Sequence, residues 1–120
     1  MSFKYPLATV TWDQKEIDAM HDVIASANFT MGKRVGLFEK SFSKYIGSQY
    51  AVMVNSGSSA NLLMIAALFY TKNPKLKLKR GDEVIVPAVS WSTTYYPLYQ
   101  YGLKIKFIDI DIETLNYDLV

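Results

Sequence analysis

Apolar residues recur at helical spacing in the first part of this chain. The first such stretch predicts a helix over residues 14–26, with Asp13 as its cap and Glu16 completing a capping box. The second predicts a helix that ends just before Gly47. The apolar positions of the two stretches are Ile17, Met20, Val23 and Ile24, then Val35, Phe38, Phe42 and Tyr45. Residues 27–32 interrupt the pattern, and we expect Gly32 to let the chain turn there.

The polar residues on these two helices have simple interpretations. His21, the single histidine, borders the first apolar face without a second ligand or base at helical spacing, so we interpret it as partly packed or solvent-exposed. Glu39 lies opposite the second apolar face and is most simply a solvated charge.

From residue 50 onward, short apolar runs alternate with helical stretches. They predict, in order, a strand over 50–54, a helix ending near Tyr70, a strand over 83–86 stopped by Pro87, a helix over 92–101 and a strand over 104–110. Two successive strand–helix–strand units indicate an α/β fold with a parallel sheet. In such sheets, ligands bind beyond the carboxyl ends of the strands.

The first strand is followed by a turn of small polar residues, Asn55-Ser56-Gly57-Ser58-Ser59. A helix that starts there leaves backbone N–H groups unpaired beside a partial positive charge, which suits a phosphate. Small polar residues also cap helices that bind no ligand, so both interpretations remain open at this point. The turn has one glycine and matches neither the dinucleotide fingerprint nor the P-loop.

A second polar turn, Ala88 to Thr94, follows the next strand and contains Trp91. An aromatic side chain at this edge, close to a phosphate site, could lie against a flat conjugated ring. Trp91 could equally fill the hydrophobic core.

Charged residues elsewhere indicate no further site. Asp109 and Asp111 flank Ile110 and would point to opposite faces of a strand, so caps at the strand end are favoured over a metal site. Five basic side chains within residues 71–82 fit a solvated loop better than a nucleic-acid surface, because no other basic patch supports them.

Composition narrows the class of protein. The chain has 120 residues, half of them hydrophobic, a net charge of +2 and no cysteine. This predicts one globular domain without disulfides or thiolate metal sites. The N-terminal residues lack the apolar core of a signal peptide, and no apolar run approaches the roughly 20 residues of a membrane span. We therefore expect a cytoplasmic protein that binds neither nucleic acid nor membrane.

Several motifs run in the order of one known family. They are FTMGKRVGLFEKSFSKYIGSQYAVMVNSGSSANLL, GDEVIVPAVSWSTT and YGLKIKFIDIDIETLN, and the likeness extends from Tyr5 to Asp118. The chain resembles the N-terminal part of the pyridoxal-phosphate-dependent nucleotide-sugar aminotransferases and dehydratases of the DegT and StrS type.

The resemblance implies a fold-type-I large domain, an aspartate-aminotransferase-like α/β sheet that works as a homodimer. Residues 1–120 would form an N-terminal arm and an incomplete first part of that domain. Gly57 and Ser58, with Ser59, would hold the phosphate of pyridoxal or pyridoxamine phosphate, and Trp91 would stack on its ring. The turn with Phe29 and Thr30 would lie near a nucleotide-linked keto-sugar.

Within the family, PAVSWSTTYYPLYQYG and SGSSANLLMIAALF are most similar to the dehydratase branch. This implies removal of the C3 hydroxyl from a nucleotide-linked 4-keto-6-deoxy sugar, with an amino donor such as glutamate regenerating the cofactor. The alternative within the family is a sugar aminotransferase. The two differ in one later residue, a histidine in the dehydratase and a lysine in the aminotransferase.

The family's acid–base motif lies after Val120, so we predict no catalytic residue in this chain and no activity from it alone. A third alternative, from another class, is a short non-catalytic module that binds a cofactor or a partner.

Overall fold

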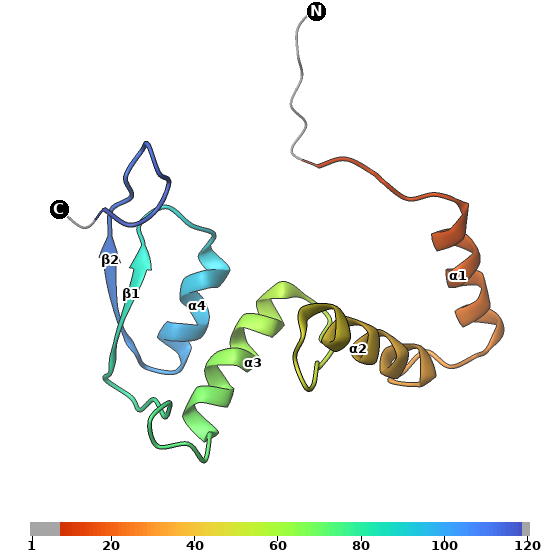
Figure 1. The fold of residues 1–120 in the computed structure, drawn as a ribbon, viewed down its shortest axis with the longest axis horizontal. Coiled ribbons are helices and arrows are strands. Elements are labelled where there is room, and N and C mark those ends of the chain that lie inside the picture. The colour runs from red at the N-terminus through yellow and green to blue at the C-terminus, as the bar shows by residue number, and fades with distance from the viewer. Residues whose placement is uncertain (1–7, 119–120) are drawn as a thin grey trace, which may run out of the picture. The chain divides into compact units, whose positions relative to one another are not determined.

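The computed structural model describes residues 8–118, which excludes the Tyr5 end of the expected N-terminal arm. The chain divides into two compact units, Met1–Met53 and Val54–Val120. Its helices and strands, in order, are α1 (Gln14–Ala25), α2 (Lys33–Ile46), α3 (Gly57–Tyr70), β1 (Glu83–Pro87), α4 (Ser92–Gln100) and β2 (Lys104–Ile108) (Figure 1).

Helix α1 begins as the sequence predicts. The Asp13 carboxylate accepts a hydrogen bond from the Lys15 N–H at 2.7 Å, and the Asp13 N–H donates to the Glu16 carboxylate at 2.8 Å. The second of these bonds, together with the reciprocal bond from the Glu16 N–H to the Asp13 side chain, forms the predicted capping box. The helix ends at Ala25, with Ser26 as its cap, and His21 is exposed.

The turn between α1 and α2 does not depend on the backbone freedom of Gly32, which the sequence suggested. Gly32 has a φ of −143°, which any residue can adopt, whereas Ala27 takes the left-handed conformation with a φ of 53°. A Cβ atom on Gly32 would lie 2.6 Å from the Asn28 side-chain nitrogen, so a larger residue there would require the Asn28 side chain to move. At the other end of α2, Gly47 adopts the left-handed cap conformation with a φ of 78°, as predicted.

Glu39 of α2 is not simply a solvated charge. Its carboxylate accepts a hydrogen bond from the backbone N–H of Met53 at 2.8 Å. The interaction ties the segment after α2 back to the helix, and sequence spacing did not reveal it because the partner lies 14 residues away.

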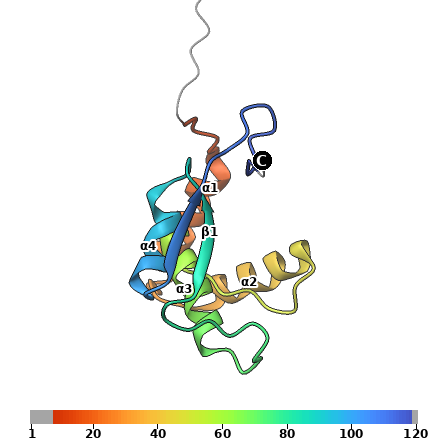
Figure 2. The same ribbon diagram turned by 90° about the vertical axis from the view of Figure 1, so that its left-hand side faces the viewer.

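Within residues 54–118, the second unit contains one strand–helix–strand arrangement, β1–α4–β2, whose two strands pair in parallel with Val84 opposite Ile105. Figure 2 shows the two strands side by side. Val86, Leu98 and Leu103 form the buried core. Partly buried side chains from α3, the connection after it, α4 and the sheet surround it, namely Ile65, Phe69, Leu78, Val84, Tyr95 and Ile105.

The predicted strand over 50–54 is wrong for this structure, because these residues do not join a sheet. A strand requires backbone pairing with a neighbour, and here two of its backbone groups are bonded to side chains instead. The Met53 N–H donates to Glu39, and the Tyr50 carbonyl accepts from the Ser48 hydroxyl at 2.8 Å. One of the two expected strand–helix–strand units is therefore present among residues 8–118.

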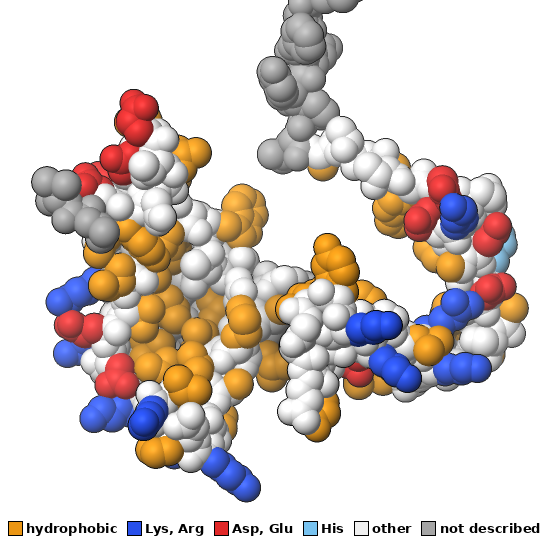
Figure 3. Space-filling model, in the orientation of Figure 1, with side chains coloured by type: hydrophobic (Ala, Val, Ile, Leu, Met, Phe, Trp, Pro, Cys, Tyr) orange, Lys and Arg blue, Asp and Glu red, His pale blue; other side chains and the backbone are white. Residues whose placement is uncertain are grey.

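Helix α3 is apolar around its whole circumference, and several of its large side chains remain accessible. Leu62, Leu63 and Met64 are 39%, 45% and 59% exposed. Figure 3 shows hydrophobic side chains at the surface over this part of the chain. Among the described residues, no helix has both the length and the apolar character to cross a membrane.

The acidic residues after β2 cap the end of the strand, as the sequence predicts, although the strand ends at Ile108 and not at residue 110. Asp111 accepts hydrogen bonds from the backbone N–H groups of Glu113 and Thr114, at 2.7 and 2.8 Å. The Asp109 carboxylate accepts from the Ile110 N–H at 2.9 Å. The bonds from Thr114 and Glu113 favour the charged form of Asp111 and hold its pKa below the ordinary value of 3.8.

We predict that this turn loosens in acid. A carboxyl group whose pKa is lower in the folded chain stabilises the fold above its ordinary pKa, and that contribution is lost as the pH falls through the folded value. Nuclear magnetic resonance should show the Glu113 and Thr114 amide signals moving together in that range. Asp111→Asn, which keeps an acceptor oxygen but cannot ionise, should abolish this titration. Unaltered signals in the unsubstituted chain would contradict the prediction.

Candidate functional site

The serine turn starts α3 and satisfies part of its own backbone. The Ser56 hydroxyl accepts the Ser59 N–H at 3.2 Å, and the Ser56 carbonyl accepts the Ala60 N–H at 3.0 Å. The first N–H groups of a helix have no partner within the helix, so those of Gly57 and Ser58 remain available to a ligand. Capping and anion binding are thus compatible, since they use different N–H groups.

The surroundings of this turn leave room for an anion. A Cβ atom built on Gly57 would meet no atom within 4 Å, and Gly57 and Ser58 are exposed while Ser59 is half-buried. The first turn of α3 contains no acidic residue that would repel an anion. Backbone N–H groups and hydroxyls at a helix start form a donor set that suits a phosphate group.

The second polar turn is anchored on both sides of Trp91. The Tyr95 hydroxyl donates to the Pro87 carbonyl at 2.9 Å, and the Ala88 N–H donates to the Ile108 carbonyl at 2.7 Å. Trp91 itself caps α4, and its carbonyl accepts the Thr94 N–H at 2.9 Å. The turn is therefore fixed to the carboxyl ends of β1 and β2.

Trp91 does not fill the core. It is 75% exposed. A large aromatic side chain held at the surface by an anchored turn is available to pack against a flat ligand.

The first turns of α3 and α4 lie next to each other. The Asn61 side-chain amide donates to the Thr93 carbonyl at 3.2 Å, which links the two helices. Ser58, Ser59 and Thr93 line a small cavity of about 200 Å³ between them. The structure thus brings the predicted phosphate-binding serines close to the turn that begins at Trp91.

Sequence reasoning missed Asn61 and Tyr95, which hold this arrangement. For Asn61 a signal existed, because it is the single polar side chain in the otherwise apolar stretch of residues 60–69. Tyr95 could not be singled out, because α4 contains several tyrosines and the sequence does not indicate which of them contacts a distant carbonyl.

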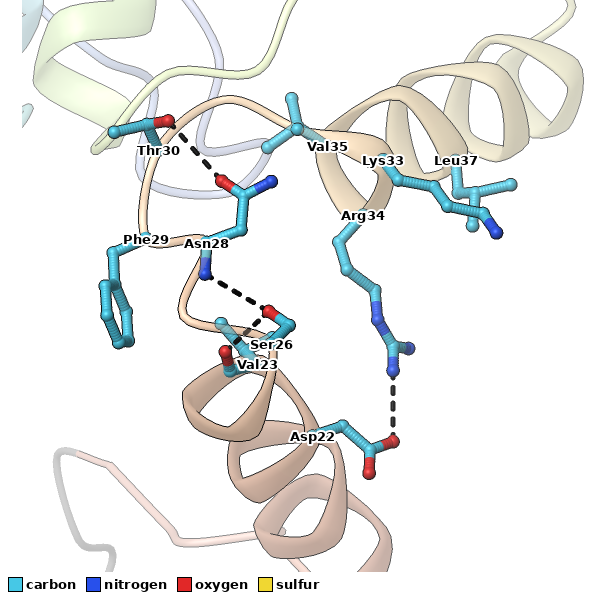
Figure 4. A pocket seen from close by; sticks show the side chains of 11 residues that line it. Asp22, Val23, Ser26, Asn28, Phe29, Thr30, Lys33, Arg34, Val35 and Leu37 are labelled. Carbon is cyan, nitrogen blue, oxygen red and sulfur yellow. Dashed lines mark hydrogen bonds and ion pairs between the residues drawn. The ribbon is translucent and has the colours of Figure 1, made fainter.

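The remaining predicted residues, Phe29 and Thr30, belong to the unit Met1–Met53. They line a cavity of about 730 Å³ formed by the end of α1, the following turn and the start of α2 (Figure 4). Phe29 is 71% exposed, and the Thr30 hydroxyl donates to the Asn28 side chain at 3.5 Å. Within residues 8–118, no cluster of three or more His, Cys, Asp or Glu side chains could hold a metal ion.

The sequence of the chain matches one known protein family along most of its length. The sequence model of the DegT/DnrJ/EryC1/StrS aminotransferase family matches residues 10–120. The chain therefore belongs to this family.

Two curated relatives that are 65% identical to the chain are dehydratases, and a relative that is 30% identical is an aminotransferase. The chain is 65% identical over 115 residues to the GDP-4-keto-6-deoxy-D-mannose 3-dehydratase of Yersinia pseudotuberculosis. It is also 65% identical to the Escherichia coli enzyme solved with bound hydrated pyridoxal phosphate, with a TM-score of 0.87. A mutant GDP-4-keto-6-deoxymannose-3-dehydratase solved with bound GDP-perosamine gives the same identity and TM-score.

These matches cover almost the whole chain but a minor part of each relative. In all three, the aligned region is 96% of this chain and 29% of the other protein. The chain thus spans less than a third of the length of the curated relatives that it matches.

We predict that Tyr95→Phe loosens the Trp91 turn without disturbing the core. The substitution removes the hydroxyl that donates to Pro87 and keeps the ring, whose centroid lies 5.1 Å from that of Phe107. Loss of one hydrogen bond should lower the free energy of unfolding by about 1 kcal/mol. In a Trp12→Phe background, the fluorescence anisotropy of Trp91 should fall, because the exposed ring moves more freely once its turn is loosened. Equal anisotropy with and without the hydroxyl would contradict the role assigned to Tyr95.

Proposed function

We propose that the protein, at its full natural length, catalyses the 3-dehydration of GDP-4-keto-6-deoxy-D-mannose with pyridoxal or pyridoxamine phosphate as its cofactor. This is a step of deoxysugar biosynthesis for lipopolysaccharide. The observation that carries the choice of reaction is the 65% identity to dehydratases along 96% of the chain. Residues 1–120 would contribute the N-terminal arm and the first part of the cofactor-binding domain.

The serine turn is proposed to hold the cofactor phosphate. The available N–H groups of Gly57 and Ser58 would donate to its oxygens, and the hydroxyls of Ser58 and Ser59 would add further donors. Because these groups sit on the rigid start of α3, they would bind the phosphate without first becoming ordered. When bound, the cofactor would supply an electron sink for the breaking of bonds next to the sugar ketone.

Trp91 is proposed to support the face of the cofactor ring. Its exposure and the hydrogen bonds that anchor its turn favour this role, because a ring platform must be accessible and must keep its orientation. Asn61, which joins α3 to the backbone of Thr93, would keep the phosphate donors and the ring platform in register.

Phe29 and Thr30 are proposed to contact the nucleotide-linked keto-sugar. The cavity of about 730 Å³ that they line is within the usual size of a small-molecule site. Glutamate as the amino donor, a homodimer and a cytoplasmic location remain predictions that complete this proposal. We assign no catalytic acid or base among residues 1–120.

A nucleotide-sugar aminotransferase is the second candidate function. It is favoured by the description of the matched family, which is named for aminotransferases. The two reactions share the cofactor and the keto-sugar, so the products distinguish them.

We expect the protein at full natural length, supplied with cofactor, glutamate and GDP-4-keto-6-deoxy-D-mannose, to form a sugar product that has lost the C3 hydroxyl. Mass spectrometry of the nucleotide sugars would measure this directly. A product that has gained an amino group in place of the ketone would show instead that the protein is an aminotransferase. Unchanged sugar in the presence of bound cofactor would refute both candidates.

We further expect Trp91→Ala to weaken cofactor binding roughly two- to tenfold, since an aromatic contact of this kind contributes about 0.5–1.5 kcal/mol. Because Trp91 lies outside the core, the melting temperature without cofactor should not change. Cofactor absorbance during titration measures the binding, and Trp12→Ala, which removes another exposed tryptophan, is the matched control. A fall in melting temperature with unchanged cofactor binding would exclude the ring platform.

A further inference from the structure

Helix α4 contains a proline in its interior, which leaves one of its backbone carbonyls without a helical partner. In an α-helix each carbonyl accepts the N–H four residues later, so the carbonyl of Thr93 would pair with residue 97. Residue 97 is Pro97, which has no N–H and whose ring fills the space that the bond would occupy. The Thr93 carbonyl therefore needs a donor from outside α4.

Asn61 of α3 supplies that donor. Its side-chain amide donates to the Thr93 carbonyl at 3.2 Å, and the bond is partly buried. A backbone carbonyl that is withdrawn from water and unpaired destabilises a fold, so the bond meets a need that Pro97 creates. The two residues that break the pattern of their helices, a polar residue in the apolar stretch 60–69 and a proline in a helix interior, thus explain each other.

The bond also selects one arrangement of the two helices, which lie side by side (Figure 1). Helix α3 is apolar around its circumference, and apolar burial has no direction, so packing alone favours no single face of α3 against α4. A hydrogen bond is directional. The amide of Asn61 and the carbonyl of Thr93 can meet in one register of the helices only.

This bond lies at the candidate cofactor site. Asn61 follows Gly57 by four residues, so the two lie on the same face of α3, one turn apart. Thr93 follows Trp91 by two residues, and both Thr93 and Pro97 line the cavity of about 200 Å³ between the starts of α3 and α4. A bond at this place acts on the spacing between the phosphate donors and the tryptophan.

We infer that Pro97 and Asn61 act together as positioning residues for the cofactor. Pro97 frees the Thr93 carbonyl and Asn61 binds it, which fixes the phosphate donors at the start of α3 relative to Trp91. The inference rests on the proposed function for the roles of the two turns, and it adds the residues that set the spacing between them. Both residues act through the backbone of Thr93 and are assigned no contact with the cofactor.

The test is a double-substitution cycle in the protein at full natural length, with pyridoxal phosphate as the probe. Asn61→Leu keeps the approximate size of the side chain and removes the donor. It should weaken cofactor binding roughly two- to tenfold, the loss expected for one hydrogen bond. It should also change the circular dichroism of the bound cofactor, which depends on the orientation of the cofactor ring in its site.

Pro97→Ala restores an N–H at position 97, which can pair with the Thr93 carbonyl inside α4. This substitution should weaken cofactor binding in the same direction, because the carbonyl then turns back toward its own helix. The double variant should bind the cofactor about as well as the weaker single variant, since both substitutions break the same link. Losses that add up in the double variant would overturn the inference.

Asn73→Leu is the matched control. It removes another side-chain hydrogen bond, in which the Asn73 carbonyl oxygen accepts the Lys75 N–H at 3.0 Å, in the connection after α3. It should leave the affinity for the cofactor and the circular dichroism of the bound cofactor unchanged, whatever its effect on the melting temperature. A purely structural role of Asn61 would give the same result as this control and would overturn the inference. If Pro97→Ala does not fold, unchanged cofactor binding by Asn61→Leu overturns it as well.

Melting temperatures without cofactor and product analysis, recorded on the same samples, separate this inference from the proposed function. A dehydratase with bound cofactor in which the two losses are additive would retain the function and reject the positioning pair. If the protein binds no cofactor, the proposed function fails, and so does the role of the pair at the cofactor. Non-additive changes in melting temperature would then still support the link from Pro97 through Thr93 to Asn61.

Discussion

The packing of α4 against the parallel pair β1 and β2 is the constraint on which the candidate cofactor site depends. Val86, Leu98 and Leu103 are the buried residues of this contact, one each from β1, from α4 and from the residue before β2. The contact is small, so polar bonds at its edges have large effects on geometry. Tyr95 adds such a bond at the carboxyl end of β1, where the chain turns toward Trp91. A platform for a flat ring can be exposed and still ordered because its turn is anchored in this way.

At the start of α3, one side chain caps the helix while other backbone N–H groups stay available to a ligand. A helix has more N–H groups at its beginning than its own carbonyls can accept, and Ser56 satisfies one of them through its hydroxyl. The remaining groups of Gly57 and Ser58 provide the chemistry that a phosphate requires. Capping stabilises the helix and orients the binding groups, so the local stability of the turn and its proposed function support each other.

The first unit shows how polar contacts outside a core can define a cavity. Its described helices bury no residue completely, yet side-chain hydrogen bonds and the pair between Asp22 and Arg34 set the geometry of the turn between them. Exposed pairs contribute little to stability. The pair between Asp22 and Arg34 therefore acts mainly on the positions of these side chains.

The sequence by itself determined the features that depend on near neighbours. The capping box at Asp13, the helix end before Gly47, the serine start of α3 and the capping role of Asp111 were all predicted, because each involves residues a few positions apart. Tertiary structure decided the features that need distant partners. Glu39 bonds to Met53, residues 50–54 do not join the sheet, Trp91 stays at the surface and Asn61 reaches Thr93. Local pattern records which groups can form a bond, whereas the fold decides which partner comes within reach.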